Sequence, residues 1–445
     1  MRLTHFLRLL LCLALAVPLG SLVVAPPSSH SQAVDVFLNV MAGGAKKLNI
    51  AVPEFTLVVG ADSQGLRQKI AEVTAADLRF SALFSVAGGT PPLPVNDPES
   101  LKKALQEFAA AGAHAALQGL LALRGDRAET EMRLYDLTTS EFRLIATKTF
   151  GLPTAHARRL AHKIADEVVY QFTGEPGIAD TKIAAVGSAS GSKEIYVMDY
   201  DGVGTTRLTV TESINVTPVW SPDTRSLAFT SYMWGYPYLF RLFVFERRPI
   251  QLISGFPGIN TTPAWTPDGK FVALTLTKDG NPEIYVLNVA TGTTRRLTNY
   301  WGIDTEPSWS PSGRELAFVS DRAGAAQIFV MDAEGSNVRR LTFGGGFNTQ
   351  PRWSPKGDQI VYTSRQGPND LWVVNVGGSN PRRLTSGAGF NESASWAPNG
   401  RHLVFQSNRF GPWQLFTMLA DGSEQQPMTR GPGETTNPSW SLRLP

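Results

Sequence analysis

The stretch Trp265-Thr266-Pro267-Asp268-Gly269 decides the fold, because close copies of it recur through the second half of the chain. Six tryptophans open the same short phrase, in which Trp is followed by Ser, Thr or Ala, and in the first five Pro comes next. They are Trp220, Trp265, Trp309, Trp353, Trp396 and Trp440. Neighbouring tryptophans lie 43 to 45 residues apart. A period of roughly 40–50 residues is typical of a four-stranded propeller blade, so the sequence predicts a repeat protein built of blades.

Each repeat contains four stretches that favour β-strands. The tryptophan phrase is the first, and we expect its six tryptophans to pack between blades. A tight turn such as Pro267 to Gly269 follows, because Pro presets φ and Gly accepts positive φ. The second and third strands are short β-favouring runs, such as Val272 to Leu274 and Ile284 to Val286. The fourth strand carries Arg-Arg-Leu-Thr, as at Arg295 to Thr298.

The first and last repeats complement one another. Residues 182 to 210 carry strands two, three and four without a tryptophan strand before them, whereas Trp440-Ser441 is a tryptophan strand without a second strand after it. Pairing the two would remove two free sheet edges. We therefore predict an α/β N-terminal domain followed by an all-β six-bladed propeller, closed by pairing of N-terminal and C-terminal strands in one blade.

Residues 1 to 33 are predicted to be a secretory signal. Arg2 and Arg8 precede an apolar core from Leu9 to Val17, which is too short to span a bilayer. Ser31-Gln32-Ala33 offers small residues at both cleavage-determining positions, so we expect cleavage after Ala33 and a mature start at Val34. Cys12 is the only cysteine and would leave with the signal, so no disulfide or thiol chemistry is expected in the mature chain.

The charge and hydropathy of the chain argue against nucleic acid as a partner and against a membrane-spanning segment in the mature chain. The formal net charge of +3 falls to about +1 once two arginines leave with the signal. No run of lysine and arginine of the kind that nucleic acid needs occurs, so we expect no nucleic-acid partner. Nothing after residue 33 is long and apolar enough for a membrane span. A monomer is expected.

Residues 34 to 175 are predicted to form the α/β domain, because the repeat is absent there. Asp97 is expected to cap a helix that has Pro98 at its first position. The expected strands cover residues 48–52, 114–123, 129–135 and 141–150, and the expected helices cover residues 64–80, 98–111 and 154–172. Gly174 to Gly177 is the expected linker, and residues 178–445 are the expected propeller.

The order of these parts resembles the TolB family over essentially the whole chain. The shared features are a signal, a short β-like mature N-terminus ahead of a strand ending Ala51-Val52-Pro53-Glu54-Phe55, an α/β domain, and six blades of the Trp-Ser-Pro-Asp-Gly kind. The resemblance implies a non-enzymatic periplasmic adaptor of the Gram-negative Tol–Pal system, which supports outer-membrane integrity and constriction at cell division. The implied partners are the lipoprotein Pal and TolA, with other outer-membrane lipoproteins or porins as further candidates. Association with the outer membrane would be peripheral, through Pal.

Partner binding is expected on the loops that join each fourth strand to the next first strand, because they rim the central channel. These loops contain no Lys or Arg and are rich in Asn, Thr, Ser and acidic residues. The candidate residues are Asn215, Ile259, Asn260, Thr262, Asp304, Thr305, Glu306, Asn348, Asn391 and Glu392. The family resemblance implies a role in Pal binding for Ile259, Asn260, Thr262, Thr305 and Glu306. The neighbouring second-to-third-strand loops add aromatic residues and Arg322, Arg365 and Arg409, a composition that suits a protein-binding face.

The mature N-terminal segment is the second expected binding surface. Its residues alternate in polarity and are Val34, Asp35, Val36, Phe37, Leu38, Asn39 and Val40. The resemblance implies that this segment is an extended peptide that binds the C-terminal domain of TolA by strand addition. An ordinary edge strand of the α/β domain would show the same alternation.

Two other function classes stay open. A hydrolase or lyase acting in the channel would need His, Arg and carboxylates clustered on the inner strands. The sequence offers mainly carboxylates there and has no Gly-x-Ser-x-Gly motif. A small-ligand or cation-binding module would use the acidic channel, although the scattered histidines argue against a metal–histidine site. We expect no catalytic residue, no protein-bound metal and no cofactor, with Ca²⁺ in the channel as the alternative.

Overall fold

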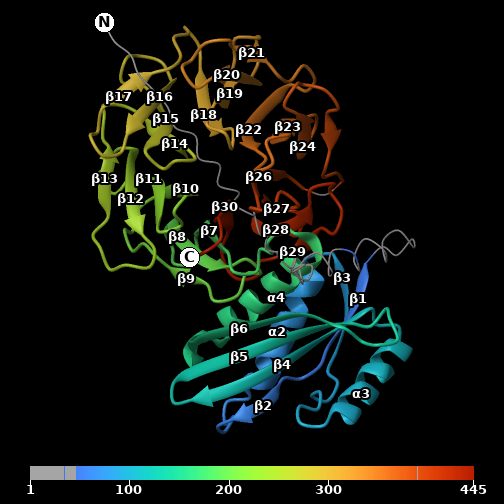
Figure 1. The fold of residues 1–445 in the computed structure, drawn as a ribbon. Coiled ribbons are helices and arrows are strands. Elements are labelled where there is room, and N and C mark those ends of the chain that lie inside the picture. Colours follow the sequence, from blue (N-terminus) through green and yellow to red (C-terminus); the bar gives the residue numbers. More distant parts are fainter. Residues whose placement is uncertain (1–34, 36–46, 388) are drawn as a thin grey trace, which may run out of the picture.

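The computed structural model describes residue 35, residues 47–387 and residues 389–445. The predicted signal, residues 1–33, therefore lies outside the described residues. So does the predicted TolA-binding segment Val34 to Val40, except for Asp35. Asp35 is exposed, and the prediction for the segment is not tested by this single residue. Figure 1 shows the two bodies that the chain forms, a sheet with helices and a propeller.

The N-terminal body is a six-stranded sheet in the order β3-β1-β4-β5-β6, with β2 also paired to β4. The strands are β1 (Leu48–Val52), β2 (Thr56–Val59), β3 (Phe84–Gly88), β4 (Ala115–Arg124), β5 (Arg127–Asp136) and β6 (Leu144–Pro153). The helices are α2 (Leu66–Phe80), α3 (Pro98–Ala110) and α4 (Ala157–Thr173), with a 3-10 turn at Thr154–His156. Strand β1 is parallel to β3 and β4, and the β4-β5-β6 part is antiparallel.

Helices cover both faces of this sheet. Helices α2 and α4 pack on the face that carries Ile50 and Leu117, whereas α3 packs through Leu105 on the face that carries Ala51 and Ala116. One face of α4 is buried in i+4 steps, and its members are Leu160, Ile164, Val168 and Phe172. The predicted cap is also confirmed, since the side chain of Asp97 accepts a hydrogen bond from the Glu99 amide at 3.1 Å.

The propeller consists of six four-stranded antiparallel sheets. The strands of the first blade are β30 (Thr435–Trp440), β7 (Lys182–Gly187), β8 (Glu194–Asp199) and β9 (Thr206–Arg207). The second and third blades are β10 (Asn215–Trp220), β11 (Ser226–Ser231), β12 (Tyr238–Phe243), β13 (Gln251–Ser254), β14 (Asn260–Trp265), β15 (Phe271–Leu276), β16 (Glu283–Asn288) and β17 (Thr294–Arg296). The fourth and fifth are β18 (Asp304–Trp309), β19 (Glu315–Ser320), β20 (Gln327–Asp332), β21 (Arg339–Arg340), β22 (Phe347–Trp353), β23 (Gln359–Arg365), β24 (Asn369–Asn375) and β25 (Arg382–Arg383). The sixth is β26 (Asn391–Trp396), β27 (His402–Ser407), β28 (Gln414–Leu419) and β29 (Gln426–Pro427).

The predicted closure of the propeller is confirmed. Strand β30 pairs antiparallel with β7, so that Trp440 lies opposite Ile183. Trp440 is buried, and its Nε1 donates a hydrogen bond to Oγ1 of Thr181 at 2.8 Å. The first blade is therefore built from both ends of the propeller and leaves no inner edge unpaired there.

The tryptophans pack between blades, as expected. The indole Nε1 of Trp220 donates to the Ser439 carbonyl at 3.1 Å, and that of Trp396 donates to the Arg352 carbonyl at 3.0 Å. In both cases the acceptor belongs to the inner strand of the preceding blade. The repeated tryptophan thus sets how one blade sits against the next.

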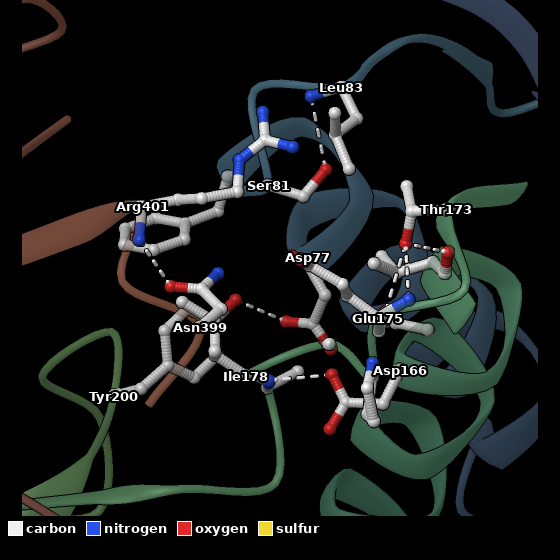
Figure 2. A pocket seen from close by; sticks show the side chains of 16 residues that line it. Asp77, Ser81, Leu83, Asp166, Thr173, Glu175, Ile178, Tyr200, Asn399 and Arg401 are labelled. Carbon is white, nitrogen blue, oxygen red and sulfur yellow. Dashed lines mark hydrogen bonds between the residues drawn. The ribbon is translucent and has the colours of Figure 1, made fainter. Parts of the chain in front are cut away.

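The α/β domain is attached to the first and sixth blades through the turns at one end of the strands (Figure 1). In the first blade, the hydroxyl of Tyr200 donates to Oδ1 of Asp77 at 2.6 Å. In the sixth blade, His402 stacks on Phe80 with ring centroids 5.1 Å apart. A small cavity of about 20 Å³ lies between the two bodies. Figure 2 shows Asp77, Tyr200 and Asp166 among the side chains that line it.

A buried charge network lies at this domain interface. His162 of α4 shares a hydrogen bond of 2.7 Å with Asp77, and its Nε2 lies 3.7 Å from Oδ2 of Asp199 in the propeller. Burial alone would lower the pKa of His162, but the carboxylates of Asp199 and Asp77 outweigh it and raise the pKa to about 9. A protonated His162 therefore joins two carboxylates across the interface at neutral pH.

The first prediction concerns the pH dependence of stability. The pKa of His162 rises from 6.5 to about 9 on folding, so its contribution is fully present below pH 6.5 and is lost as the pH rises through 9. We expect the free energy of unfolding to fall by roughly 1 kcal/mol or more between pH 7 and 9 through this group. His162→Gln keeps a hydrogen-bonding side chain but removes the titration. Denaturant unfolding of wild type and His162→Gln at several pH values measures how the free energy of unfolding of each depends on pH.

The control is His156→Gln, because His156 is exposed and lies just before the same helix. This variant should retain the wild-type pH profile. Parallel pH profiles for wild type and His162→Gln would contradict the assignment of the charge to His162.

Candidate functional site

All six inner strands begin with the same irregularity at one mouth of the channel. The pairing of each inner strand with its neighbour shifts register there, which marks a β-bulge. Each bulge holds a residue with φ between 49° and 55°, and these residues are Thr217, Thr262, Glu306, Gln350, Ser393 and Asn437. Positive φ is uncommon outside glycine. Its sixfold recurrence shows that the bulge is part of the blade design.

An asparagine or aspartate at the first or second position of five inner strands is fully buried. These residues are Asn215, Asn260, Asp304, Asn348 and Asn391. Asn260 is representative, because its Oδ1 accepts from Oγ of Ser254 at 2.7 Å and from the Phe256 amide at 3.0 Å. Its Nδ2 donates back to the Phe256 carbonyl at 2.8 Å. The sequence-based expectation that these five side chains contact a partner needs correction, because they have no exposed area and instead fix the loops.

Two of the three arginines expected on this face also turn inward. Nη2 of Arg322 lies 2.7 Å from Oδ2 of Asp304, and Nη2 of Arg409 donates to Oδ1 of Asn391 at the same distance. Burial raises the pKa of Asp304, while the Arg322 guanidinium opposes that rise. Arg365 is exposed. Arg322 and Arg409 thus brace the buried strand starts rather than project toward solvent.

An apolar ring surrounds the channel mouth, formed by the residues that immediately precede the buried anchors. We call it the apolar ring, and its members are Ile214, Ile259, Ile303, Phe347 and Phe390. Each is between 41% and 53% exposed. Glu434 takes the equivalent position in the first blade and is also exposed. Of these residues, only Ile259 was predicted from the sequence as a partner-binding residue. The signal that could have found the others is a recurring Gly-(Ile/Phe)-(Asn/Asp) motif, which contains Ile259, Ile303, Phe347 and Phe390.

The remaining predicted residues line the channel inside this ring and are half-buried. Oγ1 of Thr275 is 2.7 Å from that of Thr262 and 3.0 Å from that of Thr305, which links two blades. Glu306 accepts a hydrogen bond from the Gln350 amide at 2.6 Å, and burial raises the pKa of its carboxyl. Glu392 accepts from Nδ2 of Asn369 at 2.5 Å. The rim is therefore apolar and the channel wall polar and acidic.

No group of three or more His, Cys, Asp or Glu residues in the part of the chain that the structure describes is arranged to hold a metal ion. No helix within residues 47–387 and 389–445 is both long and apolar enough to cross a bilayer.

The fold and this face define a six-bladed propeller protein with an N-terminal α/β domain. Residues 169–444 match the family model of the TolB beta propeller domain, and residues 36–142 match that of the TolB amino-terminal domain. The chain belongs to the TolB family.

Similar proteins support this assignment. The chain is 41% identical over 207 residues to the Tol-Pal system protein TolB of Geobacter sulfurreducens, covering 46% of each protein. It is 35% identical over 259 residues to that of Desulfosudis oleivorans, covering 57% of this chain and 58% of the relative. The chain thus spans about half the length of the curated relatives it matches. The crystal structure of TolB from Acinetobacter baumannii superimposes with a TM-score of 0.78 at 26% identity, covering 89% of this chain and 97% of that one.

The second prediction separates the buried anchors from the exposed ring. Asn260→Ala leaves the Ser254 hydroxyl and the Phe256 amide without their acceptor, so it should lower the free energy of unfolding by about 1–3 kcal/mol. Ile259→Ser changes the adjacent exposed side chain and should alter stability by less than about 0.5 kcal/mol. Equilibrium unfolding in urea compares the two. Equal effects would contradict the division into anchor and surface residues.

Proposed function

We propose that this chain is a non-enzymatic periplasmic adaptor of the Tol–Pal system. In this proposal the channel mouth binds the lipoprotein Pal, and the mature N-terminal segment Val34 to Val40 binds TolA. The chain reaches the periplasm through a signal that is cleaved after Ala33. Linking Pal to TolA would support outer-membrane integrity and envelope constriction at division. The apolar ring around an acidic channel, in a member of the TolB family, is the observation that carries the proposal.

The composition of the channel mouth favours a protein partner. Protein interfaces commonly place exposed apolar and aromatic side chains against the partner, with polar groups that set orientation. Here the apolar ring offers two phenylalanines and three isoleucines, and Trp301 stands further out with 85% of its area exposed. Glu306 and Glu392 supply acceptors inside the ring. A folded domain with a protruding loop and donor groups at its tip fits this surface.

The rigidity of the loops also supports the proposal. Each exposed apolar residue of the ring is followed directly by a buried anchor. Asp304 pairs with Arg322 of its own blade, and the other four anchors each hydrogen-bond a side chain of the preceding blade, namely Glu194, Ser254, Gln327 and Asp370. The ring residues are therefore held in place before a partner arrives. Pre-ordering of this kind lowers the entropy cost of association.

The contacts that residues 47–175 make with the propeller lie away from the channel mouth. The α/β domain contacts the propeller through Tyr200 and His402, which lie at the turn end of their blades. The apolar ring lies at the other end of the same strands. Lys47, the first residue of the continuous described chain, is 3.3 Å from Glu424 in a turn-end loop of the sixth blade. Lys47 therefore lies on the side of the propeller away from the proposed Pal surface.

The proposal includes no cofactor and no catalytic residue. The alternative is a Ca²⁺ ion bound beside the channel carboxylates. A calorimetric titration with Ca²⁺ distinguishes this alternative from binding of proteins alone. A hydrolase or lyase role would need a cluster of His, Arg and carboxylates on the inner strands. In the described part of the chain, the charged side chains that line the channel wall include Glu306, Arg352 and Glu392 but no histidine.

The third prediction tests the two surfaces. Phe347→Arg places a long cation in the apolar ring and should weaken capture of purified Pal at least tenfold, which is about 1.4 kcal/mol. Capture of TolA should be unchanged. Removing residues 34–40 should abolish TolA capture, because strand addition needs the strand itself, and should leave Pal binding within a few fold.

The matched control is Val338→Arg, since Val338 is a 38% exposed apolar residue at the turn end of its blade. It should bind both partners like wild type. The two-surface proposal fails if Phe347→Arg and Val338→Arg weaken Pal capture equally, or if either test variant loses both partners while folded.

A further inference from the structure

The opposite end of the channel holds a cavity of about 430 Å³. All six blades contribute to it through the ends of their inner strands, where the tryptophan-proline phrases lie. Its wall includes the six tryptophans Trp220, Trp265, Trp309, Trp353, Trp396 and Trp440, together with prolines that follow most of them. The wall is therefore mainly apolar and aromatic, and it is separate from the apolar ring at the loop end.

One residue of this wall departs from the repeat. Arg352 is the only charged residue lining the cavity within the described chain. The equivalent position, directly before the tryptophan, is uncharged in every other blade and is occupied by Val219, Ala264, Ser308, Ser395 and Ser439. Since five blades form without a charge there, the propeller fold does not require the arginine.

The guanidinium of Arg352 is poorly neutralised. Nη1 donates to the adjacent Pro351 carbonyl at 2.9 Å. Among the described residues, no carboxylate oxygen lies within 4.0 Å of it. Burial lowers the pKa of Arg352, and the more distant Glu306 partly offsets that change. An arginine nevertheless stays protonated in proteins and offers five N–H donors in a planar fork. Most of those donors remain available at the cavity wall.

Glu306 does not complete an ion pair with Arg352. Oε2 of Glu306 accepts from the Gln350 amide at 2.6 Å, on the side toward the loop mouth. Burial raises the pKa of Glu306, and the Gln350 amide and the Arg352 guanidinium only partly oppose that rise. A positive charge without a close partner in an apolar surrounding is costly unless an anion joins it.

We propose that this cavity binds a small apolar carboxylic acid. Its carboxylate would accept two hydrogen bonds from the Arg352 fork, and its apolar body would lie against the tryptophan and proline side chains. Paired hydrogen bonds from arginine match the geometry of a carboxylate. A mostly apolar cavity with few polar groups is also the usual form of a small-molecule site. The site lies at the turn end of the channel, whereas the apolar ring of the proposed Pal surface lies at the loop end.

The experiment titrates 3-phenylpropionate into the mature full-length protein, with isothermal calorimetry and tryptophan fluorescence as readouts. The neutral amide of the same acid is the matched ligand, and it should bind at least tenfold more weakly. Arg352→Ser introduces the residue that three other blades already carry, so it should fold and should also bind the acid at least tenfold more weakly. Arg314→Ser removes an exposed arginine from a turn and should leave binding unchanged.

Several outcomes would overturn the site. These are no binding of the acid at millimolar concentration, equal binding of acid and amide, or equal binding by wild type and folded Arg352→Ser. A peptide with a free C-terminal phenylalanine is titrated in parallel, and tighter binding of the peptide than of the acid would assign the cavity to a different occupant. The comparison of acid with amide uses the wild-type protein, so it decides the question even if Arg352→Ser fails to fold. Pal capture by Arg352→Ser should be unchanged, which separates this inference from the proposed function.

Discussion

The pairing of β30 with β7 is the constraint on which the rest of the structure depends. It joins the two ends of the propeller sequence in one blade, with Trp440 opposite Ile183 and its indole bonded to Thr181. Once this ladder closes the circle, equivalent residues of the six blades must form rings around the channel. The bulge, the buried anchor and the tryptophan each become such a ring because the closed circle repeats them.

Residues that follow the repeat and residues that break it have different meanings. The anchors and the tryptophans recur because each blade needs them to fix a loop or to contact its neighbour. Arg352 breaks its ring, where every other blade has a small or apolar residue, and Glu434 breaks the apolar ring. The propeller fold does not require Arg352 or Glu434 at these positions. We therefore expect such residues to serve ligand or partner binding rather than folding. The two ends of the channel consequently differ, with an apolar rim at one and an arginine among tryptophans at the other.

The sequence predicted the architecture well, because the architecture depends on periodic and local signals. The tryptophan period, the missing strands at the two ends of the repeat and the Asp97 cap each correspond to a feature of the structure. Strands β2 and β3 were not predicted, because both are short and largely exposed rather than clearly alternating. Contacts such as His162 with Asp199 join segments that no local pattern relates.

The candidate site was predicted less well, for a physical reason. A bulge breaks the twofold alternation of a strand, so the sequence could not tell which residue of Gly-Ile-Asn faces solvent. The prediction chose polar Asn260 along with Ile259, whereas Asn260 is the buried anchor and its neighbours in the apolar ring are the exposed residues. Arg322 was likewise expected outside but pairs with Asp304. The TolA-binding role of the N-terminal segment stays a prediction, since only Asp35 of it is described.

The central claim is that partner recognition occurs at the loop mouth and not at the turn end. Hydrogen–deuterium exchange of the mature protein with and without saturating Pal tests it most directly. We expect slower exchange at residues 213–217, 258–262, 302–306 and 346–350, and unchanged exchange at the Trp-Ser-Pro turns. Protection confined to those turns or to the α/β domain, with the loop mouth unchanged, would contradict it.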